Sequence, residues 1–113
     1  MRLIEVALFS ERVDAEAAFF EALLGHPPAH RGPDIAIFED GGLQILVHTK
    51  SGSAADGPPN EDHLAFGAPD VEAACAEFQR RGYRVEFAPR DYDWGRSAYL
   101  RDPDGRLIEI HQD

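Results

Sequence analysis

Hydrophobic and polar positions follow a regular order through the first half of the chain. Residues 3–9 form a mainly apolar run that is typical of a buried strand. Apolar residues then recur at helical spacing from Val13 to Leu24, and Ser10 offers a side-chain oxygen that could cap this helix. Gly25 and the prolines after it predict the end of the helix. The pattern therefore predicts a strand followed by a helix.

Three more strands are expected before the middle of the chain. A short edge strand is predicted at 29–31, where neighbouring prolines limit its pairing. Residues 35–39 and 43–48 have strand patterns, and Asp40-Gly41-Gly42 predicts a hairpin turn between them. The first half thus has the order strand, helix and three strands.

The second half repeats this order, with Asp70 as the expected helix cap and Gly82 as the expected helix end. Its strands are predicted at 63–67, 84–88, 97–101 and 106–111, with a loop at 89–95.

The two halves also resemble each other residue by residue. Glu5-Val6-Ala7-Leu8 corresponds to His63-Leu64-Ala65-Phe66 at the start of each half. Each half alone is too short to close a core, so two packed halves would form one domain with a cleft. We therefore predict a single domain, residues 1–113, with a first module at 1–49, a linker at 50–60 and a second module at 61–113.

Charge and cysteine content narrow the possible partners. The 113 residues carry a net charge of -10, which argues against nucleic acid and anionic membranes as partners. A cationic ligand would suit this charge, although acidity in a small domain usually serves solubility. Cys75 is the only cysteine, and no apolar run is long enough to span a membrane. These features, with no signal-peptide pattern, predict a cytoplasmic protein.

Three motifs of the chain are typical of one protein family. They are the closing segment Tyr99–Ile110, which contains Asp-Pro-Asp-Gly, the tripeptide Trp94-Gly95-Arg96, and the helix that ends in Leu24-Gly25. In these motifs the chain resembles the vicinal oxygen chelate superfamily, which includes glyoxalase I, bleomycin-resistance proteins and extradiol dioxygenases. The resemblance implies an α+β fold. In that fold, two tandem βαβββ modules form a cupped mixed sheet with helices on the outer side. It also implies a homodimer, in which a site often combines the first module of one chain with the second module of the other.

The resemblance also implies a possible metal site. Metal-dependent members carry ligands on the first and last strands of each module, at positions that here hold Glu5, Leu46, His63 and Glu109. Leucine cannot bind a metal, so Gln44 or His48 on the same strand face would have to replace Leu46. Two carboxylates and an imidazole suit Zn, Ni, Mn or Fe(II). Glu109 or Glu5 is also the candidate for proton transfer beside such a metal. The alternative is that His63 and Glu109 make only local contacts and that Glu5 is a surface charge.

A small-molecule pocket is the other expectation. Aromatic and basic residues, some of them in the predicted loop at 89–95, are the candidates to line it: Phe38, Phe66, Tyr92, Trp94 and Arg96. Tyr92 and Trp94 could stack on a flat ligand, and Arg96 could hold a carboxylate or phosphate. Alternatively, Trp94 simply packs over the open end of the sheet.

Two functions therefore stand side by side. The first is a glyoxalase/bleomycin-resistance-type protein that binds a small molecule in the cleft, with catalysis undecided. The second is a metal-dependent lyase, isomerase or dioxygenase of the glyoxalase type that uses Glu5, His63 and Glu109 as ligands.

Overall fold

The computed structural model describes residues 1–52 and 56–113. The described chain divides into two compact units: an N-terminal unit, Glu5–Asp62, and a C-terminal unit, His63–Asp113 together with Met1–Ile4. Part of the linker predicted at 50–60 lies outside the described residues. The prediction of one domain with module boundaries at 49 and 61 stays a prediction.

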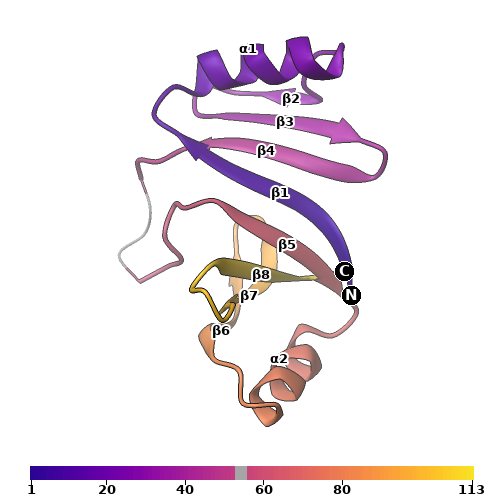
Figure 1. Ribbon diagram of the computed structural model, residues 1–113, viewed down its shortest axis with the longest axis vertical. Coiled ribbons are helices and arrows are strands. Elements are labelled where there is room, and N and C mark those ends of the chain that lie inside the picture. Colours follow the sequence, from indigo (N-terminus) through magenta and orange to yellow (C-terminus); the bar gives the residue numbers. More distant parts are fainter. Residues whose placement is uncertain (53–55) are drawn as a thin grey trace. The chain divides into compact units, whose positions relative to one another are not determined.

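The elements follow the order strand, helix and three strands twice. The first series is β1 (Arg2–Ser10), α1 (Val13–Leu24), β2 (His30–Arg31), β3 (Ile35–Asp40) and β4 (Leu43–Thr49). The second series is β5 (His63–Ala68), α2 (Val71–Arg80), β6 (Val85–Tyr92), β7 (Gly95–Arg101) and β8 (Leu107–Gln112). Figure 1 shows each helix beside the strands of its own unit. The predicted α+β class with two βαβββ modules is confirmed.

In the N-terminal unit the strands lie in the order β2-β3-β4-β1. The pair β1 and β4 is parallel, and the other neighbours are antiparallel. Alternate residues of β3 and β4 face α1, where they form a core with it. That core contains the buried residues Val13, Ala17, Ala36, Phe38 and Val47.

The C-terminal unit repeats this plan with the strand order β5-β8-β7-β6. The pair β5 and β8 is parallel, whereas β8, β7 and β6 are antiparallel. Alternate strand residues pack against α2 in a core made of Ala68, Val71, Cys75, Ala98, Leu100 and Ile110. We call the strand face turned away from α2 the open face of this unit, and it carries residues of the opposite parity, such as Ser97 and Glu109.

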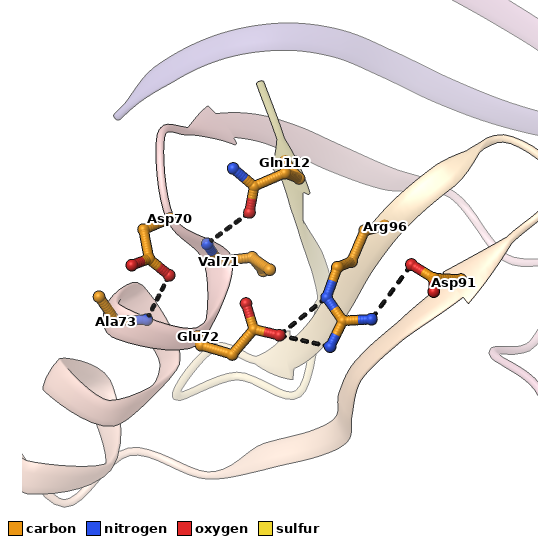
Figure 2. Close-up of polar contacts among 7 residues, drawn as sticks. All are labelled: Asp70, Val71, Glu72, Ala73, Asp91, Arg96 and Gln112. Carbon is orange, nitrogen blue, oxygen red and sulfur yellow. Dashed lines mark hydrogen bonds and ion pairs between the residues drawn. The ribbon is translucent and has the colours of Figure 1, made fainter.

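The two helices begin differently. The carboxylate of Asp70 accepts a hydrogen bond from the backbone N–H of Ala73, so the predicted cap of α2 is confirmed (Figure 2). The prediction for Ser10 is wrong. Its Oγ accepts from the N–H of Arg12, and Arg12, which makes no side-chain cap bond, is the N-cap of α1. In the part of the chain described here, neither helix is long and apolar enough to cross a membrane.

The predicted loop at 89–95 is mostly strand. β6 continues through Pro89 to Tyr92, and only a tight turn separates it from Gly95 at the start of β7. Pro89 is tolerated because β6 is the outer strand of this unit's order and its pairing is shifted by irregularities between Val85 and Arg90. The hairpin therefore places Tyr92 at the end of β6 and Trp94 in the tight turn.

We predict that Asp70→Ala lowers the free energy of unfolding by about 1 kcal/mol, because the first turn of α2 loses its side-chain acceptor. Urea denaturation measures the loss. Asp70→Asn is the matched control, since it keeps an oxygen that can accept the same bond. Equal losses in the two variants would contradict the capping role.

Candidate functional site

The open face of the C-terminal unit brings His63 and Glu109 together. β5 and β8 are parallel neighbours, with His63 beside Leu107 and Ala65 beside Glu109. The imidazole Nε2 of His63 lies 3.1 Å from Oε1 of Glu109. Their side chains are only 7% and 6% exposed. Two residues that are far apart in sequence therefore form a buried polar pair.

Ser97 and His111 complete this polar cluster. Ser97, on β7, is paired with His111 of β8, and its Oγ donates to Oε2 of Glu109 at 2.7 Å. The same Oγ lies 2.9 Å from Nδ1 of His111. Sequence reasoning missed both side chains. His111 could have been found from the sequence, because it lies two residues after Glu109 and therefore on the same strand face. Ser97 could not, because its place beside Glu109 depends on the pairing of β7 with β8.

Glu109 is held in its ionised form. Burial raises the pKa of this carboxyl, but hydrogen bonds with His111, His63 and Ser97 outweigh that effect and lower the pKa to about 2. The carboxylate therefore carries its charge at neutral pH inside a largely buried site. A buried, ionised carboxylate beside an imidazole is a suitable donor set for a divalent metal.

Aromatic rings line the same face next to the polar cluster. The ring of Tyr99, which is 2% exposed, makes edge contacts with His63 at 5.9 Å and with Phe87 at 6.1 Å between ring centroids. It also contacts Tyr92 at 5.9 Å, and Tyr92 stacks on Trp94 at 4.5 Å. The aromatic series ends at Trp94, which is 53% exposed. A ligand could therefore reach the two stacked rings that sequence analysis proposed.

Arg96 does not lie on the open face. Its Nε donates to Oε1 of Glu72 on α2 at 2.8 Å, and its Nη1 donates to Oδ1 of Asp91 at 3.1 Å (Figure 2). Hydrogen bonds raise the pKa of the guanidinium, with the larger effect from Glu72 and a smaller one from Asp91. Arg96 therefore ties β7 to α2 and β6, and its contact with a ligand stays a prediction.

Two predicted pocket residues also face a helix. Phe38 is fully buried in the core beneath α1, so its side chain is not available to a ligand. Phe66 lies three residues after His63, and strand alternation places it on the opposite face. There it borders a groove of about 400 Å³ together with Phe78 and Ile108. Neither phenylalanine lines the face that carries Glu109.

The remaining candidates belong to the N-terminal unit. Glu5 is half-buried on β1 and is paired with Gln44 of β4. The Gln44 amide donates to Oε1 of Glu39 at 2.9 Å. Nδ1 of His48 lies 2.7 Å from the carbonyl oxygen of Thr49. Glu5 stays a predicted ligand, and Gln44 or His48 stays the predicted replacement for Leu46.

We predict that the charge of Glu109 stabilises the metal-free protein by about 3 kcal/mol at neutral pH, because its folded pKa of about 2 lies below the ordinary 4.5. A depressed pKa stabilises the fold above pH 4.5, and this contribution disappears as the pH falls towards 2. Glu109→Gln should lower stability at neutral pH and flatten its dependence over this range.

Chemical denaturation at a series of pH values, with chelator present, measures this effect. Glu11→Gln is the control, because Glu11 is exposed and outside the cluster. A Glu109→Gln profile parallel to that of the parent would contradict the assignment.

Comparison with known proteins agrees with this architecture. The family model described as Glyoxalase/Bleomycin resistance protein/Dioxygenase superfamily matches residues 2–110. The chain is 25% identical to the uncharacterized protein YraH of Bacillus subtilis, over 99% of this chain and 98% of that one. It is 39% identical to a lactoylglutathione lyase of Pseudomonas aeruginosa, over 49% of this chain and 31% of the lyase.

A solved structure extends the comparison to the whole fold. The S115T variant of Streptomyces coelicolor methylmalonyl-CoA epimerase, in complex with 2-nitronate-propionyl-CoA, is 28% identical. The alignment covers 100% of this chain and 94% of the epimerase, with a TM-score of 0.70. With the family model spanning nearly all residues and the two βαβββ modules in place, this chain belongs to the Glyoxalase/Bleomycin resistance protein/Dioxygenase superfamily.

Proposed function

We propose that this protein is a divalent-metal-dependent enzyme that moves a proton on the carbon next to a thioester carbonyl. The observation that carries the proposal is the buried pair of His63 and ionised Glu109. Two relatives support the substrate class. Lactoylglutathione and methylmalonyl-CoA, which their names contain, are both thioesters with a hydrogen on the adjacent carbon.

The donor atoms of this pair fit a metal. Two donors bound to one ion at about 2.1 Å lie roughly 3.0 to 3.4 Å apart, depending on the angle between them. Nε2 of His63 and Oε1 of Glu109 are 3.1 Å apart. Imidazole nitrogen and carboxylate oxygen suit Zn, Ni, Mn or Fe(II).

We propose Glu5 as the third protein ligand. The sequence repeat supports this assignment, because Glu5 is the residue of the first half that corresponds to His63 in the second half. The carboxylate comes either from the same chain or from a neighbouring chain in a homodimer. Gln44 and His48 remain the alternatives from β4.

The chemistry divides between the bound metal and the protein. A divalent ion at this site would act as a Lewis acid and polarise the carbonyl oxygen of the substrate. Glu109, with a pKa of about 2, is a weak base, so we assign it to metal binding and charge balance. Glu5 is the proposed carrier of the proton. Tyr99 packs against the ring of His63, and Phe87 packs against Tyr99, so His63 is only 7% exposed.

We predict near-stoichiometric divalent metal in protein purified without chelator or affinity metal, and its loss in His63→Ala and Glu109→Ala. Elemental analysis measures the content. His30→Ala is the matched control, because His30 is an exposed histidine on β2. A parent protein that stays metal-free after divalent ions are added back would contradict the metal-dependent function.

We predict that Glu5→Gln slows proton exchange by about 100-fold or more while the metal content is kept, since an amide oxygen can bind a metal but cannot accept the proton. Loss of the proton signal next to the carbonyl, followed by NMR in D₂O, measures exchange in methylmalonyl-CoA and in lactoylglutathione. Exchange as fast as in the parent would exclude Glu5 as the carrier. Absence of exchange in the parent with both thioesters would overturn the substrate class.

A second candidate function is metal-free binding of a flat cationic molecule. The stacked pair of Tyr92 and exposed Trp94 favours it, together with the net charge of -10. In the presence of chelator, metal-free bleomycin should then quench the fluorescence of Trp94 saturably, and Tyr92→Ala should weaken the effect. An unchanged fluorescence signal in the parent would exclude this function for bleomycin.

A further inference from the structure

The two oxygens of Glu109 have different partners. Oε1 lies 3.1 Å from Nε2 of His63, which is the proposed metal ligand. Oε2 accepts a shorter bond, 2.7 Å, from the hydroxyl of Ser97. The carboxylate is therefore divided into an oxygen that faces the proposed metal and an oxygen that faces β7.

Hydrogen counting fixes the direction of the bonds around Ser97. An ionised carboxylate only accepts hydrogen bonds, so the single hydroxyl hydrogen of Ser97 goes to Glu109. Nδ1 of His111 lies 2.9 Å from Oγ of Ser97 and 3.6 Å from Oε2 of Glu109, so its hydrogen is directed at these two oxygens. Ser97 is fully buried, so its hydroxyl is shielded from competing water.

The backbone holds this chain of bonds in place. Ser97 and His111 are direct partners in the pairing of β7 with β8. The ring of His111 lies against Gly95, where an added Cβ would stand 2.8 Å from Cε1 of the imidazole. Gly95 also has a φ of 121°, which side chains rarely adopt. Gly95 thus leaves the space in which His111 reaches Ser97.

We propose that Ser97 is a positioning residue that makes Glu109 a one-oxygen metal ligand. By occupying Oε2, the hydroxyl keeps the carboxylate from binding the ion through both oxygens. A carboxylate that binds through both oxygens takes up an additional coordination position. The position left open is available to a substrate oxygen. This inference rests on the proposed metal site and assigns it a residue that orients one of its ligands.

The test uses the whole protein loaded with Zn²⁺. Infrared difference spectroscopy measures the separation between the asymmetric and symmetric carboxylate stretches, which is wide for one-oxygen binding and narrow for two-oxygen binding. We expect a wide separation in the parent and a narrower one in Ser97→Ala. Zn²⁺ affinity, from competition with a chelating dye, should fall about 10- to 100-fold in that variant. Ser97→Thr keeps the hydroxyl and should restore the wide separation.

The outcomes separate the two ideas. A parent that binds no Zn²⁺ overturns the proposed function and this inference together. A parent that binds Zn²⁺, with the same stretch separation in Ser97→Ala, overturns the inference alone. If Ser97→Ala does not fold, the parent decides. A narrow separation in the Zn²⁺-loaded parent, which means binding through both oxygens, would then overturn the inference.

Discussion

The burial of a negative charge at Glu109 is the constraint on which the rest of the site depends. A carboxylate that is 6% exposed would normally take up a proton, yet hydrogen bonds with His111, His63 and Ser97 keep this one ionised. Each partner comes from a strand adjacent to β8 or from β8 itself. The strand order of the C-terminal unit is therefore also the arrangement that supplies the polar partners.

The two faces of the strands in the C-terminal unit carry different kinds of side chain. Alternate strand residues pack against α2. The residues between them, which include Glu109, Ser97 and Tyr99, lie on the open face. Arg96 belongs to the face that is covered by the helix, because its guanidinium binds Glu72 of α2. A change on the helix-covered face is therefore expected to act on folding, whereas a change on the open face is expected to act on ligand binding and, at the charged Glu109, on stability as well.

Much of the fold could be predicted from the sequence, because helical spacing, strand patterns, turn glycines and the repeat all act locally. Pro89 misled the prediction, since an irregular outer strand tolerates a proline that a regular strand would not. His63 and Glu109 were found through the family resemblance. Ser97 was missed and Phe38 was misplaced, because both depend on which strands are neighbours and which face a helix covers. The pattern of one strand shows which residues share a face, but it does not show which of the two faces a helix covers.

The most direct test of this account is the titration of the Glu109 carboxyl, followed by ¹³C NMR in chelator-treated protein. The account predicts that the carboxyl stays ionised well below pH 4.5, with a midpoint near pH 2 or with ionisation kept until the protein unfolds. A midpoint at or above 4.5 in the folded protein would contradict it. In that case the hydrogen bonds of the cluster would not compensate the burial of the charge, and Glu109 would not be prepared to bind a metal.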